Sequence, residues 1–175
     1  IIRFPGGTDA DFLDWCDMVD NVPGRTAERP ISTGHLGHKV TNNFGYDEFL
    51  QFCEQVRAEA IVVVNFRDAL LKKKPLKESA AHAAALVAYC NAPLGAELPE
   101  GMYDWPFLRA KNGHHTPYKV KYFQIGNETW AFIKQLTELA RNKAPQFYVE
   151  CLVAYIEAMR SVDPSIEIIV DGHDG

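Results

Sequence analysis

A glutamate at the end of a buried strand is the residue best placed for acid–base chemistry. Glu128 and Asn127 follow the expected strand 121–125, which is rich in Tyr, Phe and Ile, and Trp130 stands two residues further on. A carboxylic acid half-buried beside aromatic rings can have its pKa raised enough to donate a proton to a leaving alcohol near neutral pH. The Asn127 amide can hydrogen-bond a sugar hydroxyl, and such bonds strengthen in an oxocarbenium-like transition state. An Asn-Glu pair alone is more often an ordinary strand end. The prediction that Glu128 is a proton donor therefore rests on its position at the end of a strand and on its aromatic neighbours.

An arginine lies at the end of the first candidate strand. Arg3 is followed by Phe4 and Pro5 and then by two glycines, Gly6 and Gly7, which let the backbone turn sharply. A buried guanidinium at this position needs a carboxylate partner or a substrate hydroxyl. A structural salt bridge beneath a cleft and direct contact with substrate are both open for Arg3.

Strands that alternate with helices must position these residues. Continuous apolar strands are typical of a parallel sheet covered on both faces, and their alternation with helical patterns indicates βαβ units. The expected strands cover residues 1–4, 60–66, 121–125 and 166–170, and the expected helices cover 47–58, 77–90 and 145–162.

Two long loops are rich in Gly, Pro, His, Trp and Tyr, and they cover residues 6–46 and 91–119. In α/β proteins the functional site lies beyond the carboxyl ends of the strands, so these loops predict a substrate cleft there. Asp47 is placed to cap the helix expected at 47–58.

The composition excludes two classes of partner. The chain of 175 residues has a net charge of -5, whereas a nucleic-acid-binding protein needs a basic face. An uninterrupted apolar segment such as 60–64 is far shorter than the roughly 20 residues of a membrane span. We therefore expect neither nucleic acid nor a membrane as a partner.

The cysteines, histidines and aspartates give no recognisable metal-binding pattern. The cysteines lack C-x-x-C spacing, which favours buried free thiols and, slightly, a cytoplasmic location. The histidine pairs lack zinc-motif spacing, so we predict no metal and no cofactor. Aspartates at every third residue lack the glycine and final glutamate of a calcium loop, which favours a solvated acidic face. These residues are Cys16, Cys53, Cys90 and Cys151; His35 with His38, His114 with His115, and His173 with Asp174; and Asp11, Asp14, Asp17 and Asp20.

Five aromatic residues lie in or near the loops. Flat rings suit both the apolar faces of sugars and packing at the mouth of a barrel, and both uses stay open for this set. The residues are Trp15, Tyr103, Trp105, Tyr118 and Trp130.

A series of short motifs, in matching order and rough spacing across nearly the whole chain, resembles family 51 of the glycoside hydrolases. No single motif is decisive, but the series is specific. It consists of Arg3-Phe4-Pro5-Gly6-Gly7, Trp15, Arg29-Pro30, the segment 41–49 (TNNFGYDEF), the segment 89–93 (YCNAP), Asn112-Gly113-His114, Pro117-Tyr118 and the segment 122–130 (YFQIGNETW).

The resemblance implies a retaining enzyme built on a (β/α)8 barrel. Residues 1–175 would be part of one catalytic barrel domain, truncated at both ends and containing barrel strands two to five. Glu128 would be the general acid/base, Asn127 its hydroxyl-binding neighbour and Arg3 an active-site residue, with Trp130 and Thr8 as further substrate contacts. The implied activity on polysaccharide or oligosaccharide is α-L-arabinofuranosidase, with endo-β-glucanase or xylanase as the alternative. A catalytically inert carbohydrate-binding barrel is the alternative of another class.

The chain departs from the family pattern in two ways. Thr8 stands where typical arabinofuranosidases of the family have an asparagine that contacts the sugar, and acidic Asp9 follows it. The family's nucleophile lies at the end of barrel strand seven, which the chain does not reach, and a retaining enzyme needs that carboxylate about 5 to 5.5 Å from the first. We therefore expect the segment to be inactive alone.

Both ends of the sequence look cut, because Ile1 begins within a strand pattern and little follows the strand at 166–170. Secretion of the parent therefore stays open. Family members often form oligomers, so a homo-oligomeric parent is open as well. Four parallel strands without closing partners would expose two sheet edges, and we expect the isolated segment to fold poorly.

Overall fold

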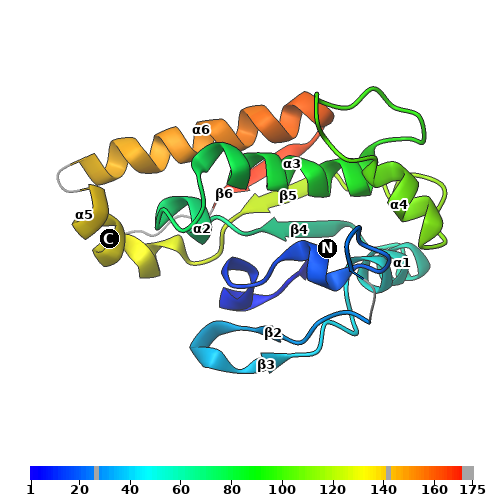
Figure 1. Cartoon of the computed structure of the whole chain (residues 1–175), viewed down its shortest axis with the longest axis horizontal. Coiled ribbons are helices and arrows are strands. Elements are labelled where there is room, and N and C mark those ends of the chain that lie inside the picture. The colour runs from blue at the N-terminus through cyan, green and yellow to red at the C-terminus, as the bar shows by residue number, and fades with distance from the viewer. Residues whose placement is uncertain (26–27, 141–142, 171–175) are drawn as a thin grey trace.

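A parallel four-stranded sheet forms the centre of the molecule (Figure 1). The structure is a computed structural model that describes residues 1–25, 28–140 and 143–170. The strands are β1 (Ile2–Phe4), β4 (Ala60–Val64), β5 (Tyr122–Ile125) and β6 (Glu167–Val170), in the order β1-β4-β5-β6. Each neighbouring pair is parallel, so all four carboxyl ends lie at one edge. The four predicted strands and their parallel arrangement are confirmed.

Three long helices match the predicted ones: α1 (Tyr46–Val56), α3 (Leu76–Asn91) and α6 (Ala144–Val162). The predicted cap of α1 was wrong. Gly45 is the N-cap residue, and the Glu48 carboxylate accepts a hydrogen bond from its amide at 2.7 Å. Asp47 is instead buried and accepts hydrogen bonds from the hydroxyls of Tyr89 at 2.6 Å and Tyr118 at 2.7 Å. Burial raises the pKa of Asp47, and the two hydroxyl donors oppose that shift.

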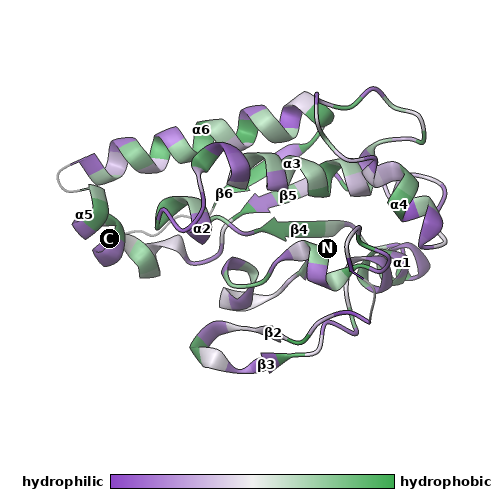
Figure 2. Ribbon diagram, viewed as in Figure 1, coloured by the Kyte–Doolittle hydropathy of each residue, from purple (hydrophilic) through white to green (hydrophobic). Residues whose placement is uncertain are grey.

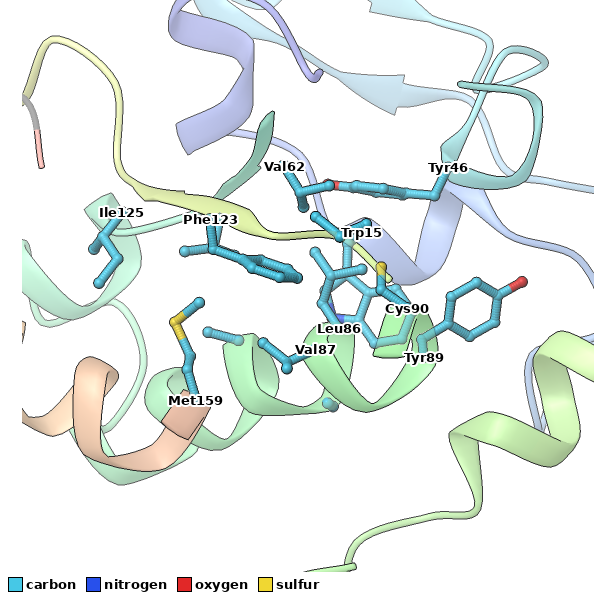
Figure 3. Close-up of a cluster of buried hydrophobic side chains, with 14 of the residues drawn as sticks. Trp15, Tyr46, Val62, Leu86, Val87, Tyr89, Cys90, Phe123, Ile125 and Met159 are labelled. Carbon is cyan, nitrogen blue, oxygen red and sulfur yellow. The ribbon is translucent and has the colours of Figure 1, made fainter. Parts of the chain in front are cut away.

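The core lies between the sheet and the pair α3 and α6, which pack side by side (Figure 1). Alternate residues of the strands point to this face, and Val62 and Phe123 are register partners on neighbouring strands. Leu86 of α3 and Met159 of α6 meet these strands in the buried cluster of Figure 3. Each such side chain contributes roughly 1.5–3 kcal/mol when fully buried. The hydropathy colouring shows the same pattern, with β4 apolar along its length (Figure 2).

Several short elements lie in segments predicted as loops or left unassigned. In the loop after β1 lie the 3-10 helices η1 (Gly7–Asp11), η2 (Trp15–Met18) and η3 (His35–Gly37) and the hairpin of β2 (Ser32–Thr33) and β3 (Lys39–Val40). The later ones are α2 (Arg67–Leu70), α4 (Trp105–Lys111), η4 (Thr129–Phe132) and α5 (Ile133–Ala140). The start of α4 was readable, because Asp104 caps it by accepting the Phe107 amide at 3.0 Å and a proline follows in its first turn.

The structure shows the state of the four cysteines and the character of the helices. All four cysteines are free; Cys53, Cys90 and Cys151 are buried and Cys16 is half-buried. Among the described residues, no helix is both long enough and apolar enough to cross a bilayer.

The sheet face opposite α3 and α6 is open. Arg3 is exposed there, and Ile61, Tyr122 and Ile169 are only half-buried on the same face. Within the described sheet, β1 and β6 each have one unpaired edge. Unpaired edges and apolar faces are templates for association.

We predict that the 175 residues expressed alone associate rather than remain monomeric, because these edges and this face find partners in other copies. Size-exclusion chromatography with light scattering checks the mass, and thermal unfolding followed by circular dichroism checks cooperativity. A monomer that melts in one sharp, reversible step would contradict the prediction.

Candidate active site

An open cleft lies at the carboxyl ends of β1 and β5. Its lining consists of Arg3, Gly7, Gln124, Asn127, Glu128, Trp130 and Ile169. Four of the five predicted site residues therefore come together, although more than 120 residues separate Arg3 from the others. The fifth, Thr8, reaches the same place through a hydrogen bond to Glu128.

Arg3 orients two side-chain amides. Its Nη1 donates to Oδ1 of Asn127 at 2.9 Å and to Oε1 of Gln124 at 3.4 Å. Among the described residues, Arg3 is exposed and bonds amide oxygens rather than a carboxylate. Gln124 was missed as a site residue, although the alternation of side chains along β5 places it on the open face with the cleft.

The amide of Asn127 keeps one hydrogen-bonding group free. Asn127 is 4% exposed, and its Nδ2 has no hydrogen-bond partner among the described residues. Because Arg3 occupies Oδ1, the remaining group is a donor. A buried donor without a partner is costly, which is typical of a group that awaits a ligand.

Glu128 stands on an unusual backbone conformation. Its φ is 49°, in the left-handed region, and such residues cost on the order of 1–3 kcal/mol and cluster at functional sites. The Thr8 hydroxyl donates to Oε2 of Glu128 at 3.2 Å. We predicted a half-buried carboxyl, which was wrong for this chain, because Glu128 is exposed at the rim of the open cleft.

Gly126 permits the turn that presents Glu128. Its φ is +74°, and a Cβ atom there would lie 2.6 Å from Cγ2 of Thr129 and 3.1 Å from Cβ of Phe66. Only glycine fits both the conformation and the space. The glycine of the Gly-Asn-Glu sequence is therefore a steric requirement of the site.

The buried carboxylate of Asp11 ties the loop after β1 to the ends of two other strands. Its Oδ1 accepts the amides of Phe66 at 2.8 Å and Arg67 at 3.2 Å, and its Oδ2 accepts the amide of Asn127 at 2.8 Å. Asp11 is fully buried, so the predicted solvated acidic face was wrong for this residue. The other aspartates of the series bond separate partners, with Asp14 on His82, Asp17 on Ser32 and Asp20 on Arg29.

The described histidines of the three candidate pairs contact carboxylates or are exposed. His38 pairs with Asp9 at 2.9 Å, and the His35 amide donates to the same carboxylate at 2.7 Å. His114 pairs with Glu54 at 3.2 Å. His115 is exposed, and His173 and Asp174 lie outside the described residues.

Most of the loop aromatics pack against one another. The Trp15 ring lies 4.7 Å from that of Trp105, which lies 5.0 Å from that of Tyr103. Tyr118 stacks on His114 at 3.8 Å. Of the five rings, only Trp130 lines the cleft.

Comparison with known proteins gives consistent matches. Residues 1–174 match the family model described as "Alpha-L-arabinofuranosidase 1 domain". A probable α-L-arabinofuranosidase C of Aspergillus flavus is 33% identical over 100% of the chain. An intracellular exo-α-(1→5)-L-arabinofuranosidase 1 of Bacillus subtilis is 29% identical over 98% of the chain. The chain spans 30% of the length of each of these relatives.

Solved structures agree with these matches. An α-L-arabinofuranosidase from Thermotoga maritima, in complex with arabinose, superposes with a TM-score of 0.67 at 28% identity, covering 97% of this chain and 30% of that one. The family 51 enzyme of Thermotoga petrophila gives 0.65 at 28% identity, with coverage of 97% and 30%. The resemblance to family 51 is confirmed, and the sheet with its helices is part of a (β/α)8 barrel.

We predict that Asp11→Asn in the complete parent protein lowers the free energy of unfolding by about 1–3 kcal/mol, because an amide NH2 would replace one acceptor and face a backbone N–H. Denaturant unfolding measures this. Asp17→Asn is the matched control, since its partner is the Ser32 hydroxyl, which can rotate to suit an amide. Equal losses in the two variants would contradict the special role of Asp11.

Proposed function

Because this chain belongs to the α-L-arabinofuranosidase 1 domain family, we propose that its parent protein is a retaining glycoside hydrolase that removes α-L-arabinofuranosyl groups from plant-type polysaccharide or oligosaccharide. Residues 1–175 then form part of its catalytic barrel, as barrel strands two to five. The observation that carries the proposal is the meeting of Glu128, Asn127 and Arg3 in one cleft at the carboxyl ends of β1 and β5. The names of the relatives favour arabinofuranosidase activity over endo-β-glucanase or xylanase activity.

Glu128 acts in this proposal as the general acid/base. Its carboxyl group donates a proton to the leaving oxygen in the first step and removes a proton from water in the second. The exposed carboxylate at the rim is accessible to a substrate that enters the cleft. Thr8 fixes one carboxylate oxygen, so the other is directed to the substrate.

Asn127 binds a hydroxyl of the sugar through its free Nδ2. Arg3 holds Oδ1 of the same amide, and this hydrogen bond sets which end of the amide faces the substrate. A hydrogen bond that strengthens as positive charge develops on the sugar stabilises the transition state more than the ground state. Trp130, which is 44% exposed, offers an apolar surface beside them.

The nucleophile of a retaining mechanism must come from elsewhere in the parent. Among the described residues that line the cleft, Glu128 is the one carboxylate. The second carboxylate needs to stand about 5 to 5.5 Å from it. The open face of the sheet leaves space for the remaining strands of a barrel to bring that group in, and the segment alone would be inactive.

The decisive experiment is hydrolysis by the complete parent protein, with wild type beside Glu128→Ala. We expect turnover of an aryl α-L-arabinofuranoside, and a loss of about a hundredfold or more in the variant because the proton donor is gone. The loss should be larger for an alkyl than for an acidic aryl leaving group, since a phenolate departs with less help from an acid.

Glu157→Gln, an exposed carboxylate on α6, is the control and should keep full activity. Soluble β-glucan and xylan are tested in parallel, and a preference for either would favour the endo-acting alternative. No turnover on any substrate would favour the inert carbohydrate-binding barrel. A Glu128→Ala enzyme as fast as wild type would exclude Glu128 as the acid.

Thr8 provides a second test of the site. Thr8→Val removes the donor to Glu128 at nearly constant volume, and we expect kcat to fall roughly twofold to tenfold, the effect of one hydrogen bond. Thr8→Ser keeps the hydroxyl and should restore most of the rate. If both variants behave alike, or if KM changes while kcat does not, Thr8 does not act through Glu128.

A further inference from the structure

Three side chains of types that bind metal ions lie close together outside the cleft. Asp14, Cys16 and His82 each offer one ligand atom, and these atoms all lie within 4.8 Å of one another. Asp14 and Cys16 belong to the loop after β1, and His82 belongs to α3, 68 residues further along the chain than Asp14. No short spacing in the sequence reveals the group, because folding alone brings the two segments together.

The backbone at this site is held in place before any ligand binds. Asp14 is the N-cap residue of η2, and its Oδ1 accepts the amide of Cys16 at 3.0 Å. The carbonyl of His82 accepts a hydrogen bond from Nε1 of Trp15 at 3.0 Å, and the two rings lie 5.5 Å apart. Nε2 of His82 lies 2.7 Å from Oδ1 of Asp14. The three potential ligand atoms are therefore already close together on a fixed backbone.

Two of the three side chains, Asp14 and His82, are accessible, and Asp14 already attracts a cation. The side chains of Asp14 and His82 are 37% and 30% exposed, beside a surface hollow that Glu78 and Tyr103 also line. Nζ of Lys74 lies 3.7 Å from Oδ2 of Asp14 and 3.6 Å from Oδ2 of Asp68. A metal ion can displace the ammonium from Asp14, because Lys74 keeps Asp68 as its partner.

We propose that Asp14, Cys16 and His82 bind a divalent transition metal of the zinc class, with water as the fourth ligand. Imidazole, carboxylate and thiolate together suit zinc or cobalt, whereas calcium and magnesium prefer oxygen ligands alone. The ion binds as Cys16 releases its proton to solvent and the ring proton of His82 moves from Nε2 to Nδ1, and the two anionic ligands balance its charge. Bonds of about 2.0–2.3 Å place tetrahedral ligand atoms roughly 3–4 Å apart, which the cluster accommodates.

A metal here would join the loop after β1 to α3. The same loop carries Thr8 and Asp11, which contact the cleft. The proposed metal is therefore a structural cross-link that steadies the loop from outside the cleft. It is independent of the proposed glycosidase activity, because none of its three ligands lines the cleft.

Cobalt titration of the complete, reduced parent protein tests the proposal by absorption. We expect one equivalent of Co²⁺ to give a thiolate-to-metal charge-transfer band that Zn²⁺ abolishes. Cys16→Ser should lose the band, and His82→Gln should bind at least about tenfold more weakly. Lys74→Gln should bind more tightly, since the competing ammonium is gone. His115→Gln, an exposed histidine elsewhere, should bind as wild type does.

Thermal unfolding of the metal-free variants shows whether each is folded, so a folding defect is not read as lost binding. The absence of a band in molar excess of Co²⁺ would overturn the proposal. A band that persists in Cys16→Ser would also overturn it, because another thiol would then hold the metal. Neither readout depends on hydrolytic activity.

Discussion

Three backbone amides that follow two different strands converge on the carboxylate of Asp11, and the shape of the cleft depends on that convergence. The amides of Phe66 and Arg67 follow β4, and the amide of Asn127 follows β5. Burying a carboxylate is expensive unless hydrogen bonds replace its water. These three N–H groups supply that replacement, so the loop after β1 is held against both strand ends. Together with the hydrogen bond from Thr8 to Glu128, this contact fixes the loop relative to the residues that follow β5.

From this anchor the cleft is assembled by contacts that leave hydrogen-bonding groups free for a ligand. Arg3 engages one end of the Asn127 amide, and the other end is a donor with no partner in the described part of the chain. Gly126 allows the turn that places Glu128 in a left-handed conformation at the rim. An unpaired buried donor and a strained acidic residue both reduce stability, and both are common where a protein reserves groups for substrate. The site therefore keeps these two groups at a cost in folding stability.

Other acidic residues hold the loop and the start of α1. Asp47 lies beneath two tyrosine hydroxyls, which are neutral donors and only partly offset the cost of burial, so its pKa is raised. Asp14 lies nearer the surface, where burial is outweighed by His82, the Cys16 amide and Lys74, which together lower the pKa of its carboxyl to about 2. The pKa values of these two aspartates therefore shift in opposite directions, because their hydrogen-bond donors and their depths of burial differ. The proposed metal site uses the shallower of these two carboxylates, where an ion can enter from solvent.

The sequence by itself determined the four parallel strands, the three long helices and the burial of three of the four thiols, and it predicted that Glu128, Asn127 and Arg3 lie at one edge of the sheet. It did so because the periodicity of apolar residues is a local property, and because strand ends in a parallel sheet necessarily share an edge. Only the tertiary structure decided the partner of Arg3, the exposure of Glu128 and the burial of Asp11 and Asp47. Those outcomes depend on contacts between segments such as Asp11 with Asn127, which lie 116 residues apart. The cluster of Asp14, Cys16 and His82 is of the same kind, since no pattern along the chain specifies which aspartate meets which histidine.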